Sequence, residues 1–288
     1  VMHAGIYYEK NSLKSKLCVE GKKLLYDYCE SNDVDYKRIG KLIVATNDQQ
    51  ISKLNSIADK ALQNGVDDLI YLNEKEIHKL EPEVNAKGAL FSPSTGIIDS
   101  YGLMQSLLKD AEDAGAMLAL NTKVMEGCFY KDDDSWCIGT QNTEVEALNI
   151  KELDIGLIYD GYHFNCDMVI NCSGLSSTET AFNLGCENHT CTPKTTYAKG
   201  NYFSLTNIKS PFNHLVYPLP SKHGLGVHAT LDLNNQVRFG PDVEWVENDD
   251  EFTVDINRSE SFYESIRQYW PNLPDDSLVP AYAGIRPK

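Results

Sequence analysis

The stretch Asp167-Met168-Val169-Ile170-Asn171-Cys172-Ser173-Gly174 decides the class of fold that the sequence predicts. Residues 167–172 are almost continuously apolar, as in a parallel strand that is covered on both faces. Small residues end this run, and a helical pattern follows over 176–184. Such a strand lets the backbone come close to a flat or phosphorylated ligand, although ordinary strand-to-helix packing explains the pattern equally well.

The regions on either side of this stretch have different patterns. From Tyr197 to Gly240, apolar and polar residues alternate and are interrupted by Pro and Gly, which predicts an antiparallel sheet. Residues 128–165 predict a β-meander with long turns. The other periodic segments predict helices at 13–28, 51–62, 73–80, 100–111 and 259–270, and strands at 40–46, 117–120 and 122–127.

The order of these segments predicts a mixed α/β fold. Its parallel part predicts an incomplete Rossmann-like domain, and its antiparallel part forms a second domain. Segments of the two kinds alternate along the chain, which fits two interleaved domains better than two consecutive ones. Interleaved domains are typical of enzymes that hold a cofactor between them.

Length and charge exclude several classes of protein. With 288 residues the chain can bury a large core and form about two domains. Its 42% of hydrophobic residues argues against disorder, and no apolar run approaches the ~18 residues of a membrane-spanning helix. The 26 Lys and Arg against 42 Asp and Glu give a net charge of -16, which argues against binding to nucleic acid or to anionic lipid.

The cysteines do not predict a metal site. The chain has eight cysteines and no C-x-x-C pair, so we expect reduced and mostly buried thiols. Cys186, His189 and Cys191 are close in the sequence, but their spacing fits no common zinc pattern. The sequence also starts without the basic and apolar segments of a signal peptide.

One motif matches a dinucleotide fingerprint by spacing alone. Gly224-Leu225-Gly226-Val227-His228-Ala229 has the G-x-G-x-x-A pattern, but a real fingerprint lies between a strand and a helix. Here prolines precede the motif and a turn follows it, so we interpret it as a hairpin. Ser173 lies in no G-x-S-x-G elbow and is therefore no candidate hydrolase nucleophile.

Chemistry alone singles out two histidines and one arginine. His3 and His228 adjoin small or apolar residues, and a histidine that lines a pocket is a suitable general base. A histidine satisfied by structural contacts is the simpler interpretation of either one alone. Arg286 follows a glycine and is either a clamp for a carboxylate or a surface residue of a loop.

Nine segments in order resemble the L-2-hydroxyglutarate dehydrogenase and oxidase family, which belongs to the FAD-dependent, D-amino-acid-oxidase-like superfamily. The segments are His3-Ala4-Gly5-Ile6-Tyr7-Tyr8, Gly40-Lys41-Leu42-Ile43-Val44, Thr95-Gly96-Ile97-Ile98-Asp99, Asn171-Cys172-Ser173-Gly174-Leu175, Lys199-Gly200-Asn201-Tyr202, Tyr217-Pro218-Leu219-Pro220, Gly226-Val227-His228-Ala229-Thr230, Phe239-Gly240-Pro241 and Ala283-Gly284-Ile285-Arg286-Pro287-Lys288. Each segment is weak evidence alone, and their common order makes the resemblance specific.

The resemblance implies a domain organisation and a reaction. An FAD-binding domain is expected at 1–35 and 96–190, with 281–288, and a substrate domain with an antiparallel sheet at 36–95 and 191–280. The expected reaction is oxidation of a small 2-hydroxy acid, first of all L-2-hydroxyglutarate to 2-oxoglutarate, by hydride transfer to FAD.

The resemblance also implies roles for particular residues. The cofactor-binding residues would be Val124, Cys172, Ser173, Gly174, Gly284, Ile285 and Arg286. His3 or His228 would be the catalytic base that takes the hydroxyl proton. Lys199, Tyr202 and Arg286 would bind the substrate.

Some features depart from the family pattern. The strand–G-x-G-x-x-G–helix that opens the family's FAD domain does not occur, and neither does the segment that follows Arg-Pro-Lys. We therefore interpret the chain as a fragment and expect it to be inactive alone. Lys199 stands where relatives often have Arg, and Leu231 stands where a basic residue is expected. An amino-acid or amine oxidase of the same superfamily and a non-catalytic fragment without cofactor are the alternatives.

The expected partners are a small 2-hydroxy acid and an electron acceptor, either oxygen or a quinone. We expect no nucleic acid and no transmembrane segment, while peripheral contact with a membrane is compatible with the sequence. The expected location is the cytoplasm, with peripheral contact at the inner membrane, or the mitochondrion if the source is eukaryotic.

Overall fold

The computed structural model describes residues 1–130, 132, 134–142, 162–186, 192, 194–219, 226–247 and 250–288. Contacts divide the chain into two compact units. The first unit contains Val1–Ala111, Lys199–Glu244 and Phe252–Gly284, and the second contains Glu112–Ala198, Trp245–Glu251 and Ile285–Lys288. Each unit combines segments that are distant in the sequence, as expected of interleaved domains. The ranges predicted for an FAD domain and a substrate domain stay a prediction.

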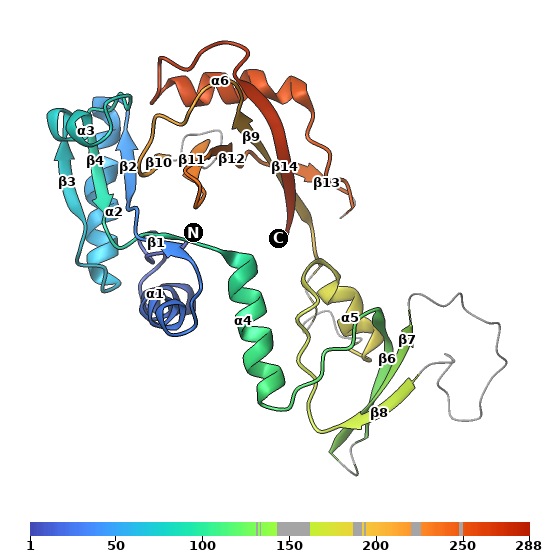
Figure 1. The fold of residues 1–288 in the computed structure, drawn as a ribbon. Coiled ribbons are helices and arrows are strands. Elements are labelled where there is room, and N and C mark those ends of the chain that lie inside the picture. Colours follow the sequence, from blue (N-terminus) through green and yellow to red (C-terminus); the bar gives the residue numbers. More distant parts are fainter. Residues whose placement is uncertain are drawn as a thin grey trace. The chain divides into compact units, whose positions relative to one another are not determined.

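A large, mainly antiparallel sheet is the centre of the first unit (Figure 1). In spatial order its strands are β13 (Glu244–Val246), β9 (Tyr197–Leu205), β12 (Val237–Gly240), β11 (His228–Leu231), β10 (Leu215–Pro218), β2 (Lys41–Ala45), β4 (Gly88–Ser92) and β3 (Ile70–Asn73), with β14 (Leu278–Pro287) also beside β9. Strand β10 runs parallel to β2 and antiparallel to β11. The antiparallel sheet predicted over 197–240 is therefore confirmed.

Helices begin where local side chains satisfy their first backbone N–H groups. Helix α1 (Leu13–Ser31) starts after Ser12, whose hydroxyl accepts a hydrogen bond from the Ser15 N–H at 3.2 Å. Helix α3 (Glu74–Leu80) starts with a capping box formed by Asn73 and Glu76. The other elements in or entering this unit are α2 (Ile51–Gln63), α4 (Ser100–Asp113), α6 (Ser259–Arg267), the 3-10 turns Asp48–Gln50 and Ile256–Arg258, and the short strands β1 (Tyr36–Lys37) and β5 (Ile97–Ile98).

The large sheet is covered on both faces where β2 crosses it. Leu42 and Val44 belong to the core that contains Phe262 and Ile266 of α6. The other face packs against helix α2, in a core that contains Ile43, Ala45, Leu54 and Ala61. Because both of its faces meet apolar side chains, β2 is buried along its whole length.

The second unit contains a three-stranded antiparallel sheet in the order β6 (Thr122–Tyr130), β7 (Ser135–Asn142) and β8 (Tyr162–Cys166). The short helix α5 (Ser177–Asn183) lies beside β6 and follows a 3-10 turn at Gly174–Ser176 (Figure 1). This sheet agrees with the predicted meander where it is described, and residues 143–161 lie outside the described part of the chain.

Two predicted strands are wrong. Residues 167–172 and 117–120 form no strand in the structure, and their apolar side chains are exposed, for example Met168 at 73% and Ile170 at 77%. A strand forms only where a neighbour accepts its backbone hydrogen bonds. Among the described strands none pairs with either segment. An apolar pattern alone was therefore not sufficient to predict a strand.

Candidate active site

One face of the large sheet carries a row of polar and aromatic side chains, and we call it the site face. The opposite face packs against helix α6, and we call it the α6 face. Ala229 of β11 and Val237 and Phe239 of β12 point into the core on this face. Since side chains alternate along a strand, the residues between them point to the site face. The row consists of Lys41 on β2, Tyr217 on β10, His228 and Thr230 on β11, Arg238 on β12 and Tyr202 on β9.

A cavity of about 530 Å³ opens on this row within the first unit. Tyr202, Tyr217, His228 and Arg238 line it from the sheet, and residues 97–100 contribute to its wall. Its volume falls in the ~300–1,000 Å³ range of small-molecule sites. The structure therefore brings together two of the predicted site residues, Tyr202 and His228, with aromatic and basic neighbours.

Tyr217 and His228 form the centre of this row. Their rings stack with 3.8 Å between centroids and an interplanar angle of 8°, because Val216 on β10 pairs with Ala229 on β11. The Tyr217 hydroxyl lies 3.5 Å from the Thr230 hydroxyl. Burial raises the pKa of Tyr217, and the Thr230 contact opposes this only in part. Tyr217 is therefore a protonated hydrogen-bond donor at neutral pH.

Arg238 is a basic residue of the cavity that the sequence analysis missed. Its guanidinium lies 5.5 Å from the centroid of the Tyr282 ring, and Tyr282 stacks on Tyr202 at 4.6 Å. The Arg238 guanidinium also forms an ion pair with Asp232 at 3.6 Å. The Arg238 side chain is 45% exposed, so water screens this pair and a carboxylate ligand can compete for the guanidinium. The alternation of Val237-Arg238-Phe239 was the signal that places Arg238 opposite the core.

The N-terminal segment brings His3 near the same face. His3 Nδ1 accepts a hydrogen bond from the Gly5 N–H at 3.0 Å, and its ring stacks on Tyr8 at 5.1 Å. Burial first, and then the charge of Lys41, lower the pKa of His3 to about 4. His3 is thus neutral at pH 7, and the bond from Gly5 leaves its proton on Nε2.

Lys41 is the second basic residue that the sequence analysis missed as a site residue. It is 2% exposed, and its amine lies 5.0 Å from the centroid of Tyr7 and 5.2 Å from that of Tyr217. Burial lowers its pKa to about 8. Each cation–π contact contributes ~0.5–2 kcal/mol, whereas burying an ion costs several kcal/mol, so the two rings offset this cost only in part. A lysine at the start of the buried strand 41–45 was the available signal.

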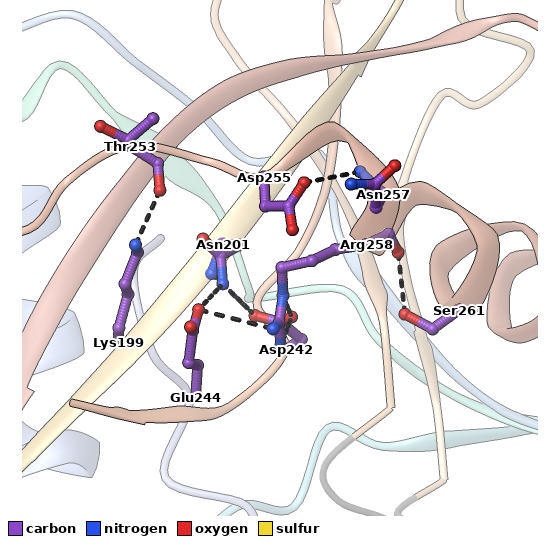
Figure 2. A network of polar contacts seen from close by, with 9 residues as sticks. All are labelled: Lys199, Asn201, Asp242, Glu244, Thr253, Asp255, Asn257, Arg258 and Ser261. Carbon is purple, nitrogen blue, oxygen red and sulfur yellow. Dashed lines mark hydrogen bonds and ion pairs between the residues drawn. The ribbon is translucent and has the colours of Figure 1, made fainter.

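Lys199 lies on the α6 face, away from the cavity. It is 4% exposed, and its amine donates a hydrogen bond to the Thr253 carbonyl at 2.7 Å (Figure 2). Lys199 and Phe203 are four positions apart on β9, so their side chains point to the same face. Phe203 packs on Phe262 of α6, which places both residues on the α6 face. The predicted role of Lys199 in substrate binding gains no support from this position.

The residues around Lys199 form a polar network that ties β9 to the segments after β12 (Figure 2). Asn201 donates from its backbone N–H to Asp242 at 2.8 Å and from its side chain to Glu244 at 3.0 Å. Arg258 Nε donates to the other Asp242 oxygen at 2.7 Å and its guanidinium pairs with Glu244 at 3.5 Å. Every carboxylate of this network has a partner, so its role is structural.

The predicted cofactor-binding residues Val124, Cys172, Ser173 and Gly174 lie in the second unit. Val124 is half-buried on β6. The Asn171 side chain accepts hydrogen bonds from the Ser173 N–H and hydroxyl, at 3.2 and 2.7 Å, which holds the turn of small residues. The other predicted cofactor residues, Gly284, Ile285 and Arg286, follow one another on β14, where Arg286 is exposed.

These residues fit a large flat group such as FAD. Cys172 and Ser173 are exposed, and Gly174 has a φ of +59°, which favours glycine. A Cβ at Gly174 or Gly284 would meet no atom within 4 Å, so a ligand has room to approach the backbone. A turn of small residues with exposed backbone is the feature expected where a ring system or a phosphate passes the chain.

The described residues contain neither a metal cluster nor a membrane-spanning helix. No three His, Cys, Asp or Glu side chains gather there as metal ligands would. The helices of the described part are also too short or too polar to cross a bilayer. Gly224, Leu225, His189 and Cys191, which the sequence analysis considered, lie outside the described residues.

The fold matches solved flavoenzyme structures. It is similar to the dithionite-reduced L-α-glycerophosphate oxidase of Mycoplasma pneumoniae with FAD bound, with a TM-score of 0.82, 21% identity, and coverage of 99% of this chain and 71% of that one. It is also similar to glycine oxidase from Geobacillus kaustophilus, with a TM-score of 0.72, 16% identity, and coverage of 100% and 70%. At these identities the likeness shows the fold, and it confirms the predicted mixed α/β class.

Sequence comparisons agree with the predicted resemblance. The chain is 40% identical over 311 residues to the mitochondrial L-2-hydroxyglutarate dehydrogenase of Arabidopsis thaliana, which covers 100% of this chain and 64% of that protein. It is 34% identical over 244 residues to the human mitochondrial L-2-hydroxyglutarate dehydrogenase, covering 84% and 50%. The chain thus spans about half to two thirds of the length of these relatives. The model of the FAD dependent oxidoreductase family matches residues 1–288, and the chain therefore belongs to the family of FAD-dependent oxidoreductases.

Proposed function

We propose that the protein containing this chain oxidises L-2-hydroxyglutarate to 2-oxoglutarate with FAD as its cofactor. The observation that carries the proposal is the 40% identity to an L-2-hydroxyglutarate dehydrogenase along the whole of this chain. The cavity on the site face supports it, because it combines a histidine, a tyrosine hydroxyl and an arginine in a volume suited to a small acid.

FAD, when bound, accepts the hydride that leaves C2 of the hydroxy acid. The chain's own part is to remove the proton of the hydroxyl group and to hold the substrate. His228 is the first candidate for the base, since its ring lines the cavity, and His3 is the second. His3 is neutral at pH 7, but to take a proton at Nδ1 it must give up the hydrogen bond from Gly5. A well-placed base contributes about 10²–10⁴-fold in rate.

Cationic side chains are needed to hold the acid. Arg238 lines the cavity, and its planar guanidinium suits two-pronged contact with a carboxylate. Arg286 stays in the proposal as a residue of β14 near the cofactor and the substrate, on the strength of the family resemblance. Replacing it by Lys would keep the charge and lose the two-pronged geometry, so unchanged KM and kcat in R286K would remove it from the site.

The cofactor would be held by the exposed turn at Cys172-Ser173-Gly174, by the β6 backbone at Val124, and by β14 at Gly284 and Ile285. Because the chain spans only part of its relatives' length, the test uses the full-length protein purified with flavin. Turnover of L-2-hydroxyglutarate, measured with a dye as electron acceptor, tests the function. No turnover by flavin-loaded protein on any 2-hydroxy acid would refute the substrate and keep the family.

The location and the natural electron acceptor belong to the same proposal. Both relatives described above carry mitochondrial in their names, so we propose a mitochondrial enzyme, which fractionation of the source cells would test. Oxygen and a quinone are the two candidate acceptors. Oxygen uptake during turnover identifies the first, and reduction of a soluble quinone under nitrogen identifies the second.

A further inference from the structure

Lys41 is a buried cation for which the described residues provide no anionic partner. Its side chain is 2% exposed, and its amine lies over the rings of Tyr7 and Tyr217. Among the described residues, no carboxylate pairs with its amine and no other group accepts a hydrogen bond from it. Buried charges are normally paired, so a lysine kept in this position indicates an anion that comes from outside the chain.

The place of Lys41 in the sheet indicates which anion this is. Lys41 lies on β2 and faces the same side as Tyr217 on β10, which is the neighbouring strand. Tyr217 in turn lines the cavity and stacks on His228. The Lys41 ammonium lies 5.2 Å from the centroid of the Tyr217 ring, so it lies beside a residue that lines the cavity.

We propose that Lys41 binds a carboxylate of the substrate, in an anion site that the rings of Tyr7 and Tyr217 complete. The inference rests on the proposed function for the identity of the acid. It assigns to Lys41 the carboxylate contact for which the sequence analysis had considered Lys199. The aromatic walls exclude water, which strengthens a single ammonium–carboxylate contact.

Several groups around the anion site titrate, and their states at neutral pH suit this role. Tyr7 and Tyr217 are uncharged, since burial raises the pKa of both. His3 is uncharged as well, because its pKa is lowered to about 4. Lys41 is therefore the positive group of this anion site, and it loses its charge as the pH rises through about 8.

The test measures binding of glutarate, which has both carboxylates of the proposed substrate and no hydroxyl group to oxidise. Calorimetric titration of the full-length, flavin-loaded protein at pH 7 would compare wild type, K41M, K41R and K87M. Lys87 is the control, because it is exposed and pairs with Glu74 at 3.2 Å. We expect K41M to weaken binding roughly 10- to 100-fold, as for loss of a charge-assisted hydrogen bond. K41R should keep more of the affinity than K41M, and K87M should bind as the wild type does.

Stability provides a readout that separates a binding role from a structural one. Removal of an unpaired buried charge should raise the melting temperature of K41M without ligand, while glutarate should no longer raise it further. Unchanged glutarate affinity in K41M would overturn the inference. So would a lower melting temperature in K41M that K41R restores, because Lys41 would then be structural. A shifted flavin reduction potential with unchanged glutarate affinity would also overturn it, since Lys41 would then serve the cofactor.

The same samples separate failure of this inference from failure of the proposed function. Turnover of L-2-hydroxyglutarate by the wild type with unchanged glutarate affinity in K41M refutes the inference alone. Lys41-dependent binding of glutarate in a protein that oxidises no 2-hydroxy acid supports the anion site and refutes the proposed reaction.

Discussion

Each face of the large sheet holds a buried lysine, and the two lysines differ in the partners of their amines. On the α6 face, Lys199 donates to the Thr253 carbonyl, and its neighbours Asn201 and Arg258 belong to a network in which each carboxylate has a partner. On the site face, the Lys41 amine lies over the rings of Tyr7 and Tyr217, and no carboxylate of the described residues pairs with it. Both lysines are almost fully buried. Burial alone therefore does not distinguish a structural cation from a ligand-binding one, whereas the partner of the amine does.

The difference also fits the proposal that the site face carries the chemistry. On the α6 face, Phe203, Phe239 and Phe262 belong to the apolar core. The site face presents Tyr217, His228 and other polar groups to a cavity of about 530 Å³.

The largest effect should come from the base on the site face. In the full-length enzyme, H228A or H3A should lower kcat by about 10²–10⁴-fold, because the hydroxyl proton then has no acceptor. Steady-state turnover of L-2-hydroxyglutarate measures this. His78, which is exposed on α3, is the matched control, and H78A should keep normal turnover. Normal turnover in both H228A and H3A would show that neither histidine is the base.

The next effect concerns the pH dependence of stability. At pH 7 Lys41 is charged in the folded and the unfolded protein, so the cost of burying the charge is fully present. Above pH 8 the folded protein releases this proton, whereas the unfolded chain keeps it up to about 10.5. The unfolding free energy of the wild type relative to K41M should therefore rise between pH 8 and 10.5, by up to about 3 kcal/mol.

Urea unfolding of the wild type and K41M at pH 7 and pH 10 would measure this difference. K41M is the reference that cancels the titration of all other groups. If the difference between the two proteins were the same at both pH values, Lys41 would have an ordinary pKa and the contrast between the two lysines would disappear.

A smaller effect is expected on the α6 face. K199M should lower the unfolding free energy by ~1–3 kcal/mol, because the charged hydrogen bond that ties β9 to the Thr253 carbonyl is lost. The KM for L-2-hydroxyglutarate should not change, since Lys199 points away from the cavity. A raised KM with unchanged stability would instead restore the substrate role that the sequence suggested.

The smallest effect should come from Arg238. This side chain is half-exposed and forms an ion pair with Asp232, so its replacement should raise the KM by only about 2- to 5-fold. R258M on the α6 face is the matched control and should leave the KM unchanged. Equal KM values for wild type and R238M would show that the cavity holds its ligand without this guanidinium.

Much of the fold could be predicted from the sequence because local signals agree with it. Ser12 and the Asn73–Glu76 capping box mark the starts of α1 and α3. Residues 197–240 alternate as the strands β9 to β12 require. The strand predicted at 167–172 is wrong, because a strand needs a neighbour to pair with. None of the described strands pairs with this segment.

The candidate site was predicted less well, since it depends on which residues share a face. Tyr202 and His228 were named from the resemblance and line the cavity. Lys199 was named as well, and the pairing of β9 turns it to the α6 face. Lys41 and Arg238 were missed, because their roles follow from the strand order β12-β11-β10-β2, which brings together residues nearly 200 positions apart.

Flavin absorbance tests the central claim most directly. The full-length, flavin-loaded protein is titrated without oxygen with L-2-hydroxyglutarate, and separately with its D enantiomer, glycine and sarcosine. We expect L-2-hydroxyglutarate to bleach the oxidised flavin band and to yield 2-oxoglutarate in equal amount, while the other three compounds leave the spectrum unchanged. Reduction by an amino acid with no response to L-2-hydroxyglutarate would contradict this expectation.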